Sequence, residues 1–470
     1  MNIARLCILT ATMLLAAHAG ADGVQWVCST DQTRWEQRND FTVTAFKADE
    51  VNDVMITHYT EQQWMGFGGC FGELGWDALQ LLDPASRKHV LDQLFGLAHG
   101  AALTFCRTPI GANDFARNYY SLDDHPGDLE MRRFSIARDR TALIPYIKAA
   151  LAVNPDLQVW ACPWTPPAWM KTNSHYATKA GQGNGYPGPD MEHGQDQFIM
   201  RDDYLQAYAT YFSKYLTEYK KEGIHIGMIM FQNEPYTINI WPNCSWSPQG
   251  TVRFLGQHLG PMLEREHPDV KMWYGTMNTN NLDEVLQVIN DPQAGKYITG
   301  AGLQWEGKDI VAALRRQFLQ MPLMCTENEC GNGSNDWAAA EHTFATVKNY
   351  IENGVNAYMY FNMVLQDQGT SSWGWNQNSL VNIDSRTCKA TFTPEFLLIK
   401  HLSHYVKPQA FKLKTMGNDD AMLAFRNPDG STVIFIANTH GRPLEMTIAC
   451  NWQVIHTKLP AHSFNTIRIE

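Results

Sequence analysis

The feature that most constrains the fold is a repeated alternation of short apolar runs with segments of helical periodicity, which begins at Met65. Such alternation predicts parallel strands joined by helices, and eight units predict a closed (β/α)8 TIM barrel of the α/β class. In one helical segment Leu205, Tyr208 and Phe212 recur at spacings of three or four residues. The expected barrel strands are residues 65–70, 103–110, 159–164, 224–232, 270–274, 298–304, 322–325 and 355–364.

The pattern changes on both sides of the barrel. After Leu402, short alternating segments are separated by turn residues, as in Asn427-Pro428-Asp429-Gly430, which predicts a small antiparallel β domain. Residues 24–60 also alternate and have no place in the barrel, so we expect both chain ends to form one attached antiparallel β-sandwich. The predicted division is a leader (1–21), N-terminal sandwich strands (22–62), the barrel (63–404) and the C-terminal sandwich (405–470).

The first residues have the pattern of a secretory signal peptide. Arg5 precedes an apolar run over residues 6–17, which ends in two overlapping small-residue cleavage patterns, Ala17-His18-Ala19 and Ala19-Gly20-Ala21. The alternative is a buried or anchoring helix, but the run is too short to cross about 30 Å of hydrocarbon. No second long apolar stretch follows. We therefore expect a secreted or periplasmic protein without a transmembrane segment.

Composition and charge narrow the functional classes. With 44% hydrophobic and 18% charged residues the chain is typical of a soluble globular protein. A formal net charge of -11 without a long basic cluster disfavours nucleic acid as a partner. The cysteine spacings do not resemble a structural zinc site, and the strand-like surroundings of Cys70, Cys106, Cys162 and Cys325 favour buried free thiols. We expect no metal and no organic cofactor. A neutral glycan is a suitable substrate for a protein with this negative net charge.

Two predicted strands end in a carboxylate, in the segments 231–235 and 325–330. Since reacting groups of a barrel lie at the carboxyl ends of its strands, Glu234 and Glu327 are expected to meet across one mouth. Glu329 is an alternative to Glu327, because residues two apart in a strand point to the same side; Glu327 is nearer the strand. The alternative to a catalytic role for Glu234 is a salt bridge at the rim of the barrel. Two carboxyls about 5–5.5 Å apart can cleave a glycosidic bond by double displacement.

Further polar and aromatic side chains follow the predicted strands and are candidates for gripping a sugar. Aromatic rings stack on the apolar faces of sugars, although a lone Trp is more often part of a core. Trp373 and Trp375 lie in a Gly- and Ser-rich loop after the eighth strand and are candidates for outer subsites. The other candidates at strand ends are Arg107, Asn113, Asp114, Trp164, Trp169, Gln304, Trp305 and Glu306.

Several of these segments carry motifs that resemble glycoside hydrolase family thirty, which contains glucosylceramidases and β-1,6-glucanases. The resemblance covers nearly the whole chain after the leader. Its most specific part is the run over residues 163–173, Pro-Trp-Thr-Pro-Pro-Ala-Trp-Met-Lys-Thr-Asn. The others are Gly66-Phe67-Gly68-Gly69-Cys70, Arg107-Thr108-Pro109-Ile110, Asn233-Glu234-Pro235 and Thr326-Glu327.

The resemblance implies a barrel with an attached β-sandwich and a retaining mechanism. It implies that Glu234 is the acid/base and Glu327 the nucleophile, and that Asn233 holds the sugar 2-hydroxyl. It also implies that Asp114 and Trp164 contact the terminal glucose and that Arg107 lies close to the nucleophile.

Departures from the family pattern indicate the substrate. Glucosylceramidases carry His-Trp-Tyr after the sixth strand, where this chain has Gln304-Trp305-Glu306, and Phe361 replaces a rim Trp. Residues 326–331 and Trp241-Pro242-Asn243-Cys244 are more similar to the β-1,6-glucanases. We hypothesise a secreted retaining endo-β-1,6-glucanase acting on β-glucan. The alternatives are a glucosylceramidase and, from another class, a non-hydrolytic glycan-binding protein, which the intact carboxylate pair disfavours.

Overall fold

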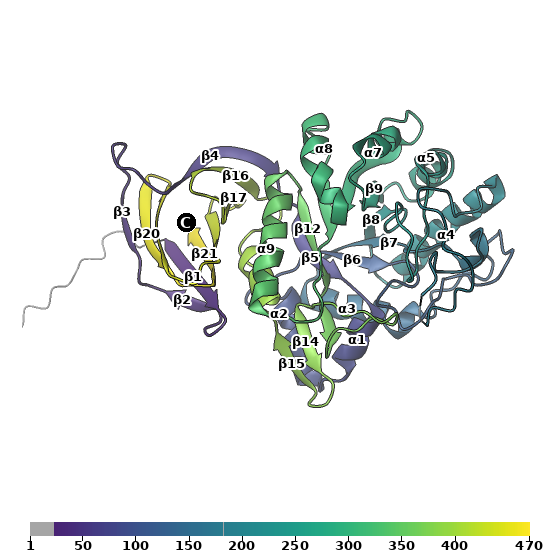
Figure 1. Ribbon diagram of the computed structural model, residues 1–470, viewed down its shortest axis with the longest axis horizontal. Helices are drawn as coiled ribbons and strands as arrows, with labels where there is room; N and C mark the ends of the chain where they lie inside the picture. The colour runs from purple at the N-terminus through teal and green to yellow at the C-terminus, as the bar shows by residue number, and fades with distance from the viewer. Residues whose placement is uncertain (1–22, 182) are drawn as a thin grey trace, which may run out of the picture.

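The structure, a computed structural model, describes residues 23–181 and 183–470. Eight parallel strands close into a barrel in the order β10-β11-β12-β5-β6-β7-β8-β9 (Figure 1). Each predicted apolar run overlaps one of these strands, so the predicted TIM barrel is confirmed. The barrel strands are β5 (Gly66–Cys70), β6 (Phe105–Pro109), β7 (Gln158–Cys162), β8 (Ile226–Met230), β9 (Lys271–Met277), β10 (Ile298–Gln304), β11 (Leu323–Glu327) and β12 (Ala357–Asn362).

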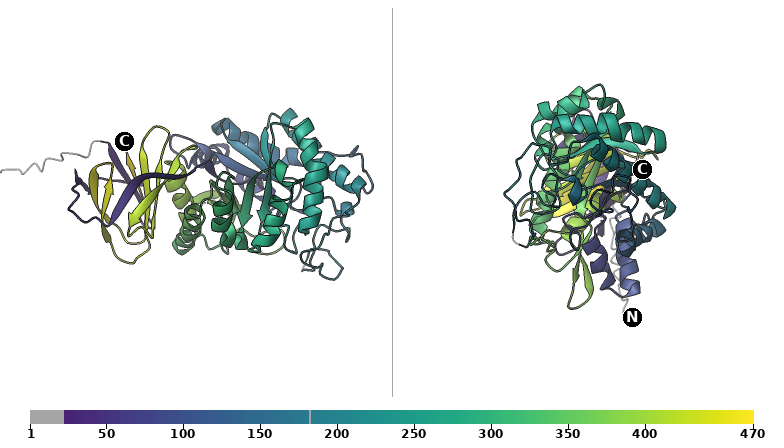
Figure 2. Two further views of the ribbon diagram at one scale, coloured as in Figure 1. Left: turned by 90° about the horizontal axis from the view of Figure 1, so that it is seen from above. Right: turned by 90° about the vertical axis from the view of Figure 1, so that its right-hand side faces the viewer.

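Helices surround the barrel strands (Figure 2). The helix α4 (Asp202–Lys221) buries Leu205, Tyr208 and Phe212, as its periodicity predicts, and Gly223 follows its end with a φ of 81°. Burial of this apolar stripe is what stabilises a helix against a sheet. The other helices are α1 (Glu73–Gln80), α2 (Pro84–Phe95), α3 (Leu143–Val153), α5 (Pro248–Phe254), α6 (Gly260–Glu266), α7 (Leu282–Ile289), α8 (Val311–Gln317), α9 (Trp337–Glu352) and α10 (Pro394–Ser403).

Both chain ends form a second domain, a ten-stranded sheet in the order β2-β1-β21-β18-β17-β16-β4-β19-β20-β3. In Figure 1 the purple N-terminal strands lie among the yellow C-terminal ones. The pairs are antiparallel except β19 with β4, which run parallel, so the predicted antiparallel pattern is corrected at this one place. The strands are β1 (Val24–Thr30), β2 (Glu36–Arg38), β3 (Thr42–Ala45), β4 (Val54–Gln63), β16 (Phe411–Gly417), β17 (Met422–Arg426), β18 (Thr432–Asn438), β19 (Leu444–Cys450), β20 (Gln453–Leu459) and β21 (Ser463–Ile469).

A buried histidine joins the two domains. His401, in α10, lies with Nδ1 3.0 Å from the Thr466 hydroxyl and Nε2 2.8 Å from the Ser29 hydroxyl. The side chains of Thr466 and Ser29 come from opposite ends of the chain, so one imidazole ties the last barrel helix to both sets of sandwich strands. Burial lowers the pKa of His401 to about 3, so the ring is neutral and donates one hydrogen bond and accepts another.

A small three-stranded sheet follows the barrel and was not expected from the sequence. It consists of β13 (Val364–Gln366), β14 (Val381–Asp384) and β15 (Lys389–Phe392). The loop between β13 and β14 carries Trp375 back to the barrel mouth. The predicted outer-subsite loop is therefore held at both ends by strand pairing.

The cysteines of the described residues are all free, and eight of these nine are buried, including the four predicted buried thiols. Within the described ranges, no helix combines the length and apolar character needed to cross a membrane. The predicted signal peptide lies outside the described residues.

Candidate active site

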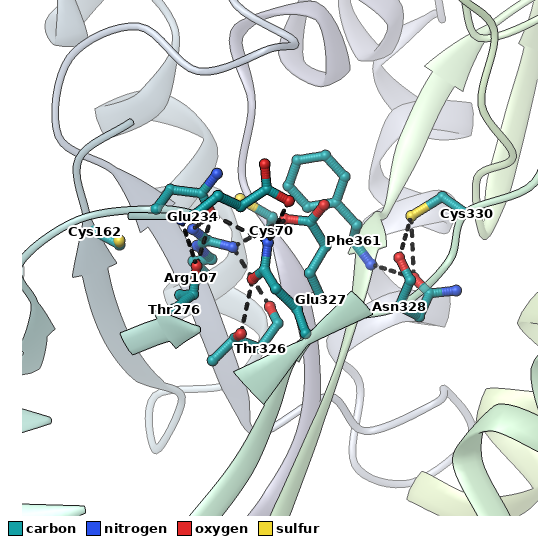
Figure 3. Close-up of polar contacts among 12 residues, drawn as sticks. Cys70, Arg107, Cys162, Glu234, Thr276, Thr326, Glu327, Asn328, Cys330 and Phe361 are labelled. Carbon is teal, nitrogen blue, oxygen red and sulfur yellow. Dashed lines mark hydrogen bonds and ion pairs between the residues drawn. The ribbon is translucent and has the colours of Figure 1, made fainter. Parts of the chain in front are cut away.

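Glu234 lies in the bend that follows β8 (Figure 3). Its φ of 47° falls in the left-handed region that residues other than glycine seldom adopt. Its backbone N–H lies 3.2 Å from both the carbonyl oxygen and the hydroxyl oxygen of Thr276, and the Asn233 N–H donates to the Pro163 carbonyl at 2.7 Å. These contacts hold the strained bend, and strain of this kind is typical of functional sites.

Glu327 is the last residue of β11 and pairs with Gln304, the last residue of β10. Gln304 Nε2 lies 3.1 Å from Glu234 Oε1 and 3.4 Å from Glu327 Oε2. The two oxygens are therefore separated by no more than the sum of these lengths. Inverting glycosidases use carboxyl spacings that begin at about 6.5 Å, which equals this maximum separation. This upper limit on the oxygen separation is compatible with the closer spacing used in double displacement.

Arg107, from β6, is fully buried between the two carboxyl-bearing segments. Its Nη1 lies 3.2 Å from Glu327 Oε2, and its Nη2 donates to Asn233 Oδ1 at 2.7 Å. The Thr276 hydroxyl donates to the same Asn233 oxygen at 2.9 Å. These donors fix the Asn233 amide, so its Nδ2, which has no partner among the described residues, is the end available to a ligand.

The two glutamates differ in their charged neighbours. Burial raises the pKa of both, and the nearby charges of Glu327 and Asp114 raise the pKa of Glu234 and of Glu327, respectively. Arg107 lowers both, but its ion pair is with Glu327. The ion pair with Arg107 favours the ionised form of Glu327, and a negative charge on Glu327 raises the pKa of Glu234.

A cavity of about 480 Å³ opens over the two glutamates. The polar atoms of Gln304 and Arg107 lie beneath its floor, where they bind the carboxylates. Asp114 has a buried Oδ1 without a hydrogen-bond partner in the described chain, which makes it available to a ligand in the cavity. The predicted site residues that line the cavity are Asp114, Asn233, Glu234, Trp305, Glu306, Glu327 and Trp375.

Two predicted sugar-contacting tryptophans do not line this cavity. Trp164 is buried, with its ring 3.9 Å from the Arg107 guanidinium carbon and 6.1 Å from the Phe361 ring. Trp373 is also buried and packs on Tyr119 at a ring separation of 4.9 Å. Trp164 supports Arg107 from behind the cavity, whereas Trp373 packs on Tyr119.

Glu329, the alternative to Glu327, points elsewhere. Its Oε1 accepts from Lys308 Nζ at 2.5 Å, and its Oε2 lies 3.6 Å from His342 Nε2. Glu329 does not line the cavity. The structure thus brings Glu327, and not Glu329, together with Glu234.

Asn113 and Trp169 also have local structural roles. Asn113 Oδ1 accepts from the Phe115 backbone N–H at 3.1 Å, which closes a turn after β6. Trp169 Nε1 donates to the Asp123 carbonyl at 2.9 Å and lies outside the cavity. Neither residue lines the cavity.

The structure adds two cavity residues, Asn239 and Trp241, that were not among the site candidates from the sequence. Asn239 Nδ2 donates to Glu234 Oε2 at 3.2 Å. Trp241 packs on Trp375 at a ring separation of 4.6 Å, and together they form an aromatic wall. Both new residues lie in the loop that follows the bend at Pro235, and this position after a catalytic strand was the available signal.

Comparison with known proteins identifies the family. A model of the glycosyl hydrolase family 30 TIM-barrel domain matches residues 64–406, and a model of the family 30 beta sandwich domain matches residues 413–467. The chain belongs to glycosyl hydrolase family 30. It is therefore a glycoside hydrolase, and the resemblance expected from the sequence motifs is confirmed.

Relatives of this family 30 protein have two different named activities. It is 25% identical to the lysosomal acid glucosylceramidase of Mus musculus over 93% of this chain and 87% of that one. It is 24% identical to the endo-1,6-beta-D-glucanase neg1 of Aspergillus fumigatus over 85% of this chain and 82% of that one. Two solved structures share its fold: SrfJ from Salmonella typhimurium, with TM-score 0.84 and 24% identity, and the endo-beta1,6-glucanase BT3312, with TM-score 0.81 and 23% identity. Each alignment covers 95% of this chain and 99% of the other.

Proposed function

We propose that this family 30 protein hydrolyses β-glucosidic bonds with retention of configuration, with Glu327 as nucleophile and Glu234 as acid/base. The observation that carries the proposal is the shared contact of both carboxyls with one Gln304 nitrogen, at 3.1 and 3.4 Å. This shared contact supports a spacing at which one carboxyl attacks the anomeric carbon while the other protonates the leaving oxygen.

The charge distribution supports these roles. Glu327, paired with Arg107 at 3.2 Å, is the group that ionises first and can attack. Attack forms a glycosyl ester and removes the negative charge of Glu327. The pKa of Glu234 then falls, so that after donating its proton it can act as the base that activates water.

Sugar binding involves the groups around the carboxylates. The unpaired Nδ2 of Asn233 is suited to the 2-hydroxyl, next to the reacting carbon. The Asp114 carboxyl is suited to accept from other hydroxyls of the terminal glucose. Gln304, Arg107 and Trp164 act from beneath the cavity by orienting the carboxylates and Asn233. Trp305, Glu306 and the Trp241–Trp375 wall are suited to further sugar units.

The proposed substrate is β-1,6-linked glucan, cleaved in endo mode. The cavity wall combines indole rings with amide and carboxyl groups, which suits a polar polymer. The exposed large apolar side chains of the described residues, such as Tyr59, Leu319 and Trp452, do not line the cavity. A substrate with two lipid tails would need such a surface near the mouth, so glucan is favoured over glucosylceramide.

A glucosylceramidase is the second candidate, because the mouse enzyme aligns over 93% of this chain. Release of reducing sugar from β-1,6-glucan without ceramide release from a short-chain glucosylceramide supports the glucanase, and the reverse supports the second candidate. NMR of the fresh product measures the configuration. An initial α-anomer would contradict retention at a β-linkage.

We also propose export through the residue 1–21 leader, with the catalytic barrel over residues 63–404 and sandwich strands in 22–62 and 405–470. The signal-peptide pattern in the sequence supports export. Amino-terminal sequencing of the protein recovered outside the cytoplasm tests it; a mature chain that keeps Arg5 contradicts cleavage.

A further inference from the structure

The amide of Gln304 is surrounded by acceptors at its nitrogen end. Besides the two carboxyl oxygens, Gln304 Nε2 lies 3.3 Å from Asn233 Oδ1. That Asn233 oxygen is itself identified as an acceptor, because Arg107 and Thr276 donate to it. The NH2 end of the Gln304 amide suits these neighbours while the carboxyls are ionised, whereas its oxygen end would suit the carboxyls only when they are protonated.

The oxygen end of the same amide faces a hydroxyl. Thr326 Oγ1 lies 2.8 Å from Gln304 Oε1 and 3.2 Å from the Leu303 carbonyl oxygen. Both neighbours are acceptors, so the hydroxyl donates, and the shorter contact is to Gln304. Thr326 is fully buried on β11, one residue before Glu327. A Cβ at Gly302 would lie 2.5 Å from the Thr326 methyl carbon, so the missing side chain there makes room for Thr326.

We propose that Thr326 is a positioning residue, whose hydroxyl holds the Gln304 amide with its NH2 end toward both catalytic carboxyls. Without the hydroxyl, the amide can turn and present its oxygen to Glu234 and Glu327. A carbonyl oxygen opposes a negative charge and favours a protonated carboxyl. The hydroxyl of Thr326 would thus tune the ionisation of a pair that it does not touch.

Other charged groups around the pair remain in place when Thr326 changes. The ionisable groups that face the glutamates are Arg107 from β6, Asp114 from the following loop, Glu306 after β10, and the thiols of Cys70, Cys162, Cys325 and Cys330. Arg107 favours ionisation of the carboxyls, and the carboxylates of Asp114 and Glu306 oppose it, whereas burial keeps the thiols neutral. A change in titration on removing one neutral hydroxyl is therefore attributable to the amide.

The direct test measures carboxyl titration without substrate. The whole protein is labelled with glutamate carrying carbon-13 in the side-chain carboxyl, and NMR signals of Glu234 and Glu327 are assigned by their loss in single Gln variants. In Thr326→Val we expect the titrations to move upward by about one pH unit. Thr326→Ser, which keeps the hydroxyl, should titrate like wild type, and so should Thr343→Val, which removes a buried hydroxyl that donates to Glu395 away from the cavity.

Unchanged titration in Thr326→Val, or an equal shift in Thr343→Val, would overturn the proposal. Thr326→Ala adds no volume and replaces Thr326→Val if that variant does not fold. The kinetic consequence rests on the proposed function. With an aryl β-glucoside as substrate, the acidic limb of the kcat/KM profile should move with the carboxyl titration. In the Thr326→Val variant KM should change less than about twofold, and kcat should fall roughly tenfold. A wild-type enzyme without turnover would contradict the proposed function, but the titration result would still decide the role of Thr326.

Discussion

The guanidinium of Arg107 stacks on the buried ring of Trp164, with 3.9 Å between its central carbon and the ring centroid. This contact holds the planar cation so that its two terminal nitrogens reach Glu327 and Asn233. Trp164 therefore acts on the reacting groups through Arg107. Trp164, which a sequence motif suggests as a sugar contact, also supports the buried cation of Arg107.

Arg107→Lys is expected to keep the charge but lose the fork geometry and the stacking. Glu327 would then be less well paired, its pKa would rise, and the acidic limb of the pH profile would move upward. Loss of the buried hydrogen bonds should also lower the free energy of unfolding by about 3 kcal/mol. The measurements are kcat/KM against pH and urea unfolding; an unchanged acidic limb would contradict the ion pair.

Glu327→Gln should reduce kcat at least about a thousandfold while a glucan oligomer still binds, because a neutral amide cannot attack the anomeric carbon. Reducing-sugar release and calorimetric titration measure the two quantities. Glu329→Gln is the matched control, since Glu329 pairs with Lys308 outside the cavity. Turnover retained in the first variant and lost in the second would transfer the role to Glu329.

Glu234→Gln should stop turnover of glucan but still permit attack on a β-glucoside with a good leaving group, which needs no acid. The glycosyl enzyme then accumulates, because water lacks its base. Azide needs no base and should restore turnover with formation of β-glucosyl azide, detectable by NMR. Absence of rescue would count against the acid/base role.

Trp375→Ala removes one face of the aromatic wall that it forms with Trp241. Stacking of one sugar on an aromatic ring contributes about 1–3 kcal/mol by analogy with base stacking, so KM for glucan should rise about tenfold. KM for an aryl β-glucoside should change little. Trp452→Ala, at a residue 79% exposed in the sandwich, is the matched control and should leave both unchanged.

Asp139 is a buried carboxyl whose oxygens accept from the hydroxyls of Tyr120 at 3.0 Å and Tyr219 at 2.8 Å. Burial raises the pKa of Asp139 to about 7. Between about pH 4 and 7 the native state holds a proton that the unfolded state has lost, so the carboxyl lowers stability as pH rises through this window. Asp139→Asn should remove that loss, making the variant more stable than wild type by about 2 kcal/mol or more at pH 8 and similar at pH 4. Urea unfolding at both values measures this; equal pH dependence in the two proteins would contradict a raised pKa.

The barrel and the two catalytic candidates could be predicted from the amino-acid sequence. Eight apolar runs specify eight buried strands through local periodicity, and closure then places every strand end at one mouth. Glu234 and Glu327 follow from that rule, because Glu327 ends its strand and Glu234 lies in the bend just after its own. The choice of Glu327 over Glu329 followed from the same reasoning, since Glu329 lies two residues beyond the strand end and its side chain points elsewhere.

The contacts between side chains of different strands could not be predicted from the sequence and are seen in the folded chain. The bridging position of Gln304, the burial of Trp164 under Arg107 and the pairing of Trp241 with Trp375 each join segments far apart in the chain. The sheet made by β13, β14 and β15 depends on pairing of short strands that have little apolar pattern of their own. Periodicity specifies which face of an element is buried, but contacts between loops depend on the packing of the completed fold, so the chemistry of this site became visible only there.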